Sequence, residues 1–311
     1  MKKRKKLEEM DVLDDFLMNA VASDAEVGES FCRILLTILL GKRIGKLRII
    51  GQHFLQGLQE GKRGIRMDVE VEEIKENDPE MPVLNVYDLE PHSRKKGENL
   101  LRRNRFYQAK IDAVHLKRGE DDFGKLPDLY VINLLDYDPF GFDYMLYTVH
   151  NKCDEVADLD YDDGLKFLYF NTKGTKGGSS EIKELLRFLQ KSKADNVVNE
   201  SIAKLYDCVE NVKVKPEVQK GYMMLEEYIY YERKEAAEEA AAEATAETII
   251  STTRENIIEL LEELGEIPQD IQDRIEDQED AAVLKRWLKE AAKTLTFEQF
   301  REAISSVKQG A

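Results

Sequence analysis

The segment from Arg63 to Leu116 constrains the fold more than any other part of the chain. Apolar and charged residues alternate from Gly64 to Glu73, which is the period of a β-strand with one face inward and one face in water. The next apolar run, Val83 to Glu90, is apolar on both faces, so we expect a central, buried strand. A basic helix from about Glu98 to Lys117 follows. Strands interspersed with helices favour a mixed α/β core.

Acidic side chains gather on these two predicted strands. Asp68 falls on the polar face of the first strand, and Asp88, Glu90 and His92 share one face at the end of the second. Burying carboxylates is costly unless a cation or hydrogen-bond donors compensate, and a divalent metal ion compensates well. The pattern therefore suits metal-assisted phosphodiester hydrolysis. The alternative is a pair of charged side chains on a solvated sheet face.

Charge is distributed unevenly along the chain. The formal net charge is -16, of which the residues from Glu226 to the end carry -12 and the first 225 residues only -4. The stretch from His92 to Arg118 holds nine Lys and Arg residues against two acids, directly after the predicted carboxylates. Phosphate binding depends on such a local patch rather than on whole-chain charge, so a DNA partner is compatible with this acidic chain.

The rest of the chain alternates between apolar strand-like and helix-like patterns. We expect two helices between Met10 and Leu40 and a strand from Ile44 to Leu55. Further strands are expected at Asp128 to Asp136, Tyr144 to Val149 and Leu165 to Phe170. Helices are expected at Glu181 to Gln190, Asp195 to Val212 and Glu217 to Thr248, followed by two or three short helices between Thr252 and Ser305.

These patterns suggest three regions. Residues 1–225 form the α/β domain, residues 226–250 an Ala/Glu-rich helical spacer, and residues 251–311 a small helical C-terminal region. The last region is long enough for a helical bundle or for a dimerisation element. A homodimer formed through the C-terminal helices therefore stays open as a hypothesis.

No membrane or secretion signal is expected. The most apolar run, Ile34 to Leu40, is far too short to cross a bilayer, and no cleavable leader pattern follows the basic N-terminus. Cys32, Cys153 and Cys208 have no metal-type spacing, which predicts buried, reduced thiols and a cytoplasmic protein.

Five short motifs together resemble, in order and spacing, the PD-(D/E)XK nuclease family transposases, also called Rpn recombination-promoting nucleases. The motifs are Arg66-Met-Asp68, Tyr87-Asp-Leu-Glu90, Arg103-Asn-Arg-Phe-Tyr-Gln108, Asp138-Pro-Phe-Gly141 and Phe170-Asn-Thr-Lys-Gly174. The resemblance covers roughly residues 8 to 230. The tail beyond it also looks like the helical extension that often follows this core.

The resemblance implies a restriction-endonuclease-like mixed sheet core flanked by helices, followed by an acidic all-helical C-terminal extension. It implies a DNA endonuclease that uses Mg²⁺ or Mn²⁺, in which Asp68 and Glu90 hold the metal. Where the family usually reads Ile-Glu-Met-Gln, this chain has Leu89-Glu-Pro-His92, so His92 takes the place of the family's Gln. Gln108 matches the Gln of the family's helical Tyr-Gln pair.

Asp68, Glu90, His92 and Gln108 are thus the expected catalytic set. The expected contacts to DNA are Arg102, Arg103, Arg105 and Lys110 on the basic helix. His53, His115 and His150 have no partners at ligand spacing in the sequence and are treated as ordinary. A second function stays open: a degenerate relative that binds DNA or a protein partner without cutting. The Pro91-His92 departure and the acidic tail favour it.

Overall fold

The computed structural model describes the backbone of residues 5–55, 65–76, 82–92, 99–116, 122–156 and 158–306, and their side chains apart from those of 51–55, 65–68 and 306. Residues 1–4, 56–64, 77–81, 93–98, 117–121, 157 and 307–311 lie outside this description. The chain divides into two compact units, Met1–Met223 and Met224–Ala311, which we describe one at a time.

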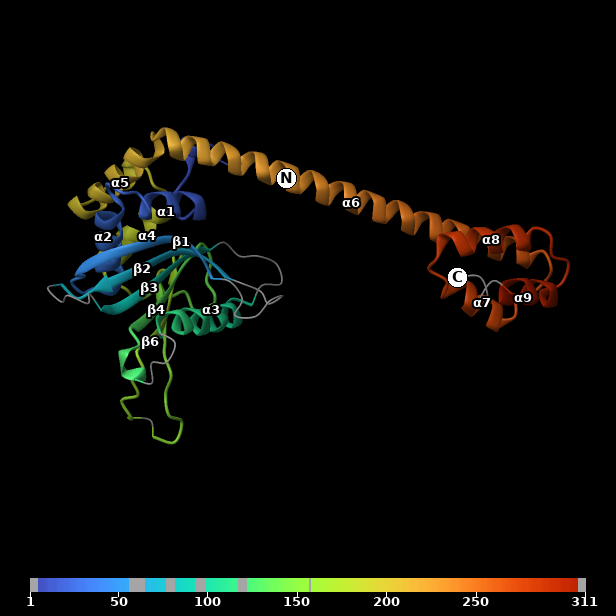
Figure 1. Cartoon of the computed structure of the whole chain (residues 1–311), viewed down its shortest axis with the longest axis horizontal. Coiled ribbons are helices and arrows are strands. Elements are labelled where there is room, and N and C mark those ends of the chain that lie inside the picture. The colour runs from blue at the N-terminus through green and yellow to red at the C-terminus, as the bar shows by residue number, and fades with distance from the viewer. Residues whose placement is uncertain are drawn as a thin grey trace. The chain divides into compact units, whose positions relative to one another are not determined.

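The first unit is built on a mixed sheet, as expected (Figure 1). Within the described residues the sheet has six strands in the order β1-β2-β3-β4-β6-β5. β1 to β3 form an antiparallel meander, β4 and β6 run parallel to β3, and β5 closes the far edge antiparallel to β6. The strands are β1 Lys46–Leu55, β2 Ile65–Ile74, β3 Val83–His92, β4 Asp128–Leu135, β5 Leu146–Val149 and β6 Leu165–Asn171.

Helices cover both faces of this sheet (Figure 1). One face carries α1 Asp15–Ala22, α2 Gly28–Leu40, α4 Ser180–Gln190 and α5 Glu200–Lys213, whose apolar sides share one large core with the sheet. Val69, Val71 and Leu89 point into that core. Because side chains alternate along a strand, Glu70, Asp88 and Glu90 point to the opposite face, which α3 Leu100–His115 covers.

The polar face of β2 differs from our expectation. We expected it to lie in water, but Glu70 and Glu72 are only 3% and 5% exposed. The expectation was wrong because α3, which comes some thirty residues later in the chain, packs over this face and brings side chains into contact with it. Alternation shows that two faces differ, but it does not show which later element covers them.

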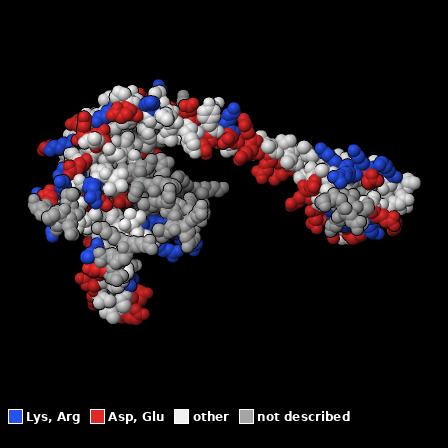
Figure 2. Space-filling model, in the orientation of Figure 1, with Lys and Arg blue, Asp and Glu red and all other residues white. Residues whose placement is uncertain are grey.

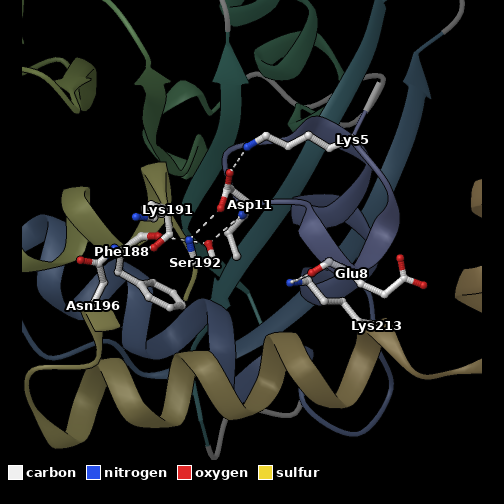
Figure 3. A network of polar contacts seen from close by, with 9 residues as sticks. Lys5, Glu8, Asp11, Phe188, Lys191, Ser192, Asn196 and Lys213 are labelled. Atoms are coloured by element: carbon white, nitrogen blue, oxygen red, sulfur yellow. Dashed lines mark hydrogen bonds and ion pairs between the residues drawn. The ribbon is translucent and has the colours of Figure 1, made fainter. Parts of the chain in front are cut away.

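The N-terminal segment is fastened to the helical layer by a polar network (Figure 3). Asp11 pairs with Lys5 and accepts the backbone N–H of Ser192, which follows α4. The Ser192 hydroxyl accepts the N–H of Val12 at 2.9 Å and donates to the carbonyl of Phe188 at 3.0 Å. A hollow of about 420 Å³ opens beside this network, on the side of the sheet away from α3.

The second unit is helical, as expected, but its first helix has different bounds. α6 runs without a break from Pro216 to Glu262, whereas we expected it to end at Thr248. No Gly or Pro interrupts residues 222–264, and Thr248 and Thr253 donate their hydroxyls to the carbonyls four residues back, which is compatible with a continuous helix. Then come α7 Gln269–Glu276, α8 Ala281–Ala291 and α9 Phe297–Ser306.

A separate apolar core holds the second unit together. It contains Ile257 and Leu261 of α6, together with residues of α7, α8 and α9 that include Trp287 and Phe300. Pro268 immediately precedes α7 and marks its start. Among the described helices, α6 included, none has a stretch apolar enough to span a bilayer.

Two of the three cysteines are buried, as expected. Cys32 and Cys208 lie in the core of the first unit, and burial raises the pKa of each thiol. Cys153 is partly exposed, so the expectation of a buried thiol was wrong there. It follows β5, outside the regular part of the sheet.

Candidate functional site

Helix α3 positions the candidate site. Asn99 caps its N-terminus by accepting the N–H of Arg102. Leu100 packs in one apolar cluster with Leu135 and Tyr169, and Ile111 in another with Val86 and Val131. These contacts at both ends hold α3 against β3, β4 and β6, so the polar residues on its inner side face the sheet at fixed places.

The expected metal ligands sit on neighbouring antiparallel strands. Val69 of β2 lies opposite Leu89 of β3, and Glu70 lies opposite Asp88. Asp68 precedes Val69, and Glu90 follows Leu89, so the two acids come next in the same register. Residues opposite each other in an antiparallel pair share a face. The side chain of Asp68 lies outside the described residues, so its approach to Glu90 stays a prediction.

Glu90, His92 and Arg103 are brought together beneath α3. Glu90 is 2% exposed and forms an ion pair with the guanidinium of Arg103. The same guanidinium lies 3.1 Å from Nδ1 of His92. Arg103 also lies 4.9 Å from the ring centre of Tyr107, and burial together with the charge of Glu90 raises the pKa of that phenol. Arg103 was expected to contact DNA, but in this structure its side chain faces the acids.

A buried hydrogen-bonded group lies next to this pair. Asn133 of β4 is in register with Glu90. The Nδ2 of Asn104 donates to the side-chain oxygens of Asn133 and Tyr169, both at 3.2 Å. Asn133 in turn donates to the carbonyl of Leu168. Buried polar groups of this kind are stable only when they are hydrogen-bonded, so this group fixes the position of α3 on the sheet.

The remaining expected residues are dispersed along α3. Gln108 donates to Asp112 of the same helix, so its described contact is not with Glu90. Arg102 and Arg105 are exposed, and the ammonium of Lys110 lies 5.6 Å from the ring centre of Phe106. Figure 2 shows Lys and Arg side chains gathered over α3. The outer side of the helix is thus basic, while its inner side meets the acids.

One cluster was missed by the sequence reasoning. Nε2 of His115 lies 3.2 Å from Oε1 of Glu70, and Nδ1 of the same ring lies 3.9 Å from Glu72. Glu72 also pairs with Arg48 of β1. His115 was treated as ordinary, although it follows Ile111 by one helical turn and so belongs to the sheet-facing side of α3. Two carboxylates and an imidazole at this spacing can hold a metal ion.

In comparisons with known proteins, no family model, no curated protein and no solved structure matches this chain. The resemblance to PD-(D/E)XK nucleases therefore depends on the motifs quoted above, and the site depends on its geometry.

Proposed function

We propose that this chain is a DNA endonuclease with a restriction-endonuclease-like core, which hydrolyses phosphodiester bonds with Mg²⁺ or Mn²⁺ in a recombination or transposition setting. The observation that carries the proposal is the pairing register of β2 and β3. Glu70 pairs with Asp88 and Val69 pairs with Leu89, so Asp68 and Glu90 come next along the same two strands. Two carboxylates in such positions are the hard oxygen ligands that these ions prefer.

Asp68 and Glu90 would hold the metal. When bound, the ion supplies Lewis-acid polarisation of the phosphate and lowers the pKa of a bound water. The donor chemistry fits, because Glu90 is an almost fully buried carboxylate that already faces a cationic group, Arg103. The site therefore favours positive charge at the position where a metal would be needed.

His92 acts in this proposal as a hydrogen-bond donor. A guanidinium has only N–H donors, so the Nδ1 that faces Arg103 is the acceptor nitrogen of the ring. The neutral imidazole then carries its proton on Nε2. A donor at this position can orient an attacking water or a phosphate oxygen. Arg103 thus positions His92.

The basic outer side of α3 would bind the DNA backbone. Arg102 and Arg105 are exposed there, and the ammonium of Lys110 lies beside the ring of the exposed Phe106. Backbone contacts of this kind orient a duplex without reading its sequence. We expect little sequence specificity.

A second candidate function is binding of DNA or a protein partner without cutting. The ion pair between Arg103 and Glu90 favours binding without cutting, because the carboxylate that would hold the metal is already paired with a guanidinium. In that case Arg103 would replace the metal as the partner of Glu90 and the chain would bind without hydrolysis.

A plasmid-nicking assay with Mg²⁺ separates the two functions. The variants are Asp68→Asn and Glu90→Gln, which remove charge and keep size, and the matched control is the exposed acid Asp154→Asn. We expect the wild type and the control to nick DNA and both site variants to lose at least a hundredfold in rate. DNA binding by the wild type without any nicking supports the second function. Nicking that both site variants retain contradicts the proposed site.

A further inference from the structure

We infer that Glu70, Glu72 and His115 form a divalent-metal site of the Zn²⁺ class, separate from the Asp68–Glu90 site and independent of the proposed nuclease activity. An imidazole nitrogen with two carboxylate oxygens suits Zn²⁺ better than Mg²⁺, which prefers oxygen ligands alone. Three protein ligands leave a fourth position for water or another group.

The donor atoms already have a spacing that suits such an ion. Bonds of about 2.0–2.1 Å in tetrahedral geometry separate two ligand atoms by roughly 3.3 Å. Nε2 of His115 and Oε1 of Glu70 are 3.2 Å apart, so both can bind one ion without moving apart. The donor atoms of all three residues lie within 4.8 Å of one another. Glu72 lies 3.9 Å from Nδ1 of the ring, so its side chain must move toward Nε2 to complete the set.

Burial and electrostatics favour a cation at this place. The side chains of Glu70, Glu72 and His115 are 4%, 7% and 10% exposed. Positions 70 and 72 are successive on one face of β2, so their carboxylates repel each other at short range in a medium of low dielectric constant. The ion pair of Glu72 with Arg48 offsets part of this repulsion. Asp88, also buried, lies opposite Glu70. A divalent ion offsets this repulsion more strongly than an imidazolium does.

The ligands come from two regular elements that are held in place. Glu70 and Glu72 belong to β2, which is paired on both sides, and His115 ends α3, which the Asn104 hydrogen bonds fix to the sheet. Ligands on a strand and a helix keep their geometry better than ligands on loops. The competing explanation is a protonated His115 that forms ion pairs with both glutamates and binds no metal.

Titration of the full-length protein with Co²⁺, a spectroscopic substitute for Zn²⁺, tests the inference. We expect one equivalent to bind with visible absorption typical of four-coordinate Co²⁺, and Zn²⁺ to displace it. His115→Gln and Glu70→Gln should each lower the affinity by at least tenfold. The matched control His150→Ala changes an exposed histidine and should bind as the wild type does. Unchanged Co²⁺ affinity in His115→Gln overturns the inference, as does a wild type that binds no Co²⁺.

The double variant Asp68→Asn, Glu90→Gln distinguishes this site from the proposed nuclease site. We expect it to keep its Co²⁺ spectrum whether or not the wild type cuts DNA. Loss of Co²⁺ binding in that variant, with binding retained in Glu70→Gln, would place the ion at the other site and overturn the inference. Thermal melts show whether each variant folds, and ¹⁴N coupling in the Cu²⁺ EPR spectrum of the wild type reports imidazole ligation without any substitution.

Discussion

At the scale of single residues, Arg103 has the largest consequence for the site because it contacts both Glu90 and His92. Arg103→Ala leaves the buried carboxylate of Glu90 without this cation. We expect a loss of about 2–4 kcal/mol in the free energy of unfolding, measured by urea denaturation. Arg102→Ala, which removes an exposed arginine from the preceding position, should cost less than about 0.5 kcal/mol. Equal effects of the two substitutions would show that the Arg103 pair adds little stability.

The same variant gives a test of metal binding at Glu90. With Arg103 removed, a divalent ion becomes the natural partner of the carboxylate. We expect 10 mM Mg²⁺ to raise the melting temperature of Arg103→Ala by several degrees more than that of the wild type, because a ligand that binds only the folded chain stabilises it. Glu90→Gln combined with Arg103→Ala is the control and should show no such gain. An equal response of all three proteins to Mg²⁺ would argue against an ion at Glu90.

A second residue-scale prediction concerns Glu73, on the other face of the sheet. Burial alone would raise the pKa of Glu73, but donors outweigh it: the hydroxyl of Tyr87 and the N–H of Gly45, both at 2.6 Å, and the amide of Asn85. The pKa is therefore below its usual 4.5. The stability from these bonds is complete above about pH 4.5 and is lost as the pH falls toward the folded-state pKa.

Glu73→Gln removes this pH dependence. At pH 7 we expect the variant to be less stable than the wild type by about 1–2 kcal/mol, because hydrogen bonds to a charged group are replaced by neutral ones. The difference should shrink as the pH is lowered below 4.5, as seen in urea denaturation at several pH values. A difference that stays constant from pH 7 to pH 3 would contradict the assignment.

At the scale of elements, the N-terminal segment is held by few groups. The Ser192 hydroxyl accepts the N–H of Val12 in a buried setting. Ser192→Ala leaves that N–H without its acceptor, which we expect to cost about 1–3 kcal/mol and to speed hydrogen exchange at Val12. Ser201→Ala, an exposed serine in α5, is the matched control and should be nearly neutral. If exchange at Val12 is the same in both variants, the network in Figure 3 does not hold the segment.

The strands and α3 could be predicted because their signals are local. Alternation within β2, the doubly apolar β3 and the basic helical stretch of α3 each depend on a few adjacent residues. The burial of Glu70 beneath α3 could not be predicted in the same way. It depends on where α3 packs after the chain has returned across the sheet, and so does the approach of His115, 45 residues from Glu70.

The length of α6 was mispredicted for a related reason. Residues 248–253 are mostly β-branched or small polar, which weakens a helix by propensity. In the structure, Ile257 and Leu261 pack in the core of the second unit. Burial of a helix end in a distant core overrides a short unfavourable stretch, because most helix stability in proteins comes from tertiary packing.

At the scale of the whole molecule, the two units differ in net charge. The residues from Glu226 onward carry -12 of the net -16, so the tail as a whole has the same sign of charge as DNA. The tail is not uniformly acidic. Figure 2 shows a basic group over α8, whose exposed side carries Lys285, Arg286 and Lys289. The acidic majority predicts repulsion of DNA, and the α8 side chains predict attraction.

A truncation after Lys234 decides between these two effects. The cut keeps Tyr222, which is buried and donates to the carbonyl of Lys5 at 2.5 Å, so the first unit retains its core. We expect the shortened chain to bind a labelled duplex about three- to tenfold more tightly at 50 mM salt, with the gain fading at 300 mM because salt screens repulsion between exposed charges. Fluorescence anisotropy measures both affinities, and light scattering shows whether the oligomeric state changes with the cut. Weaker binding by a shortened chain of unchanged oligomeric state would mean that the basic side of α8 contacts DNA and outweighs the acidic residues around it.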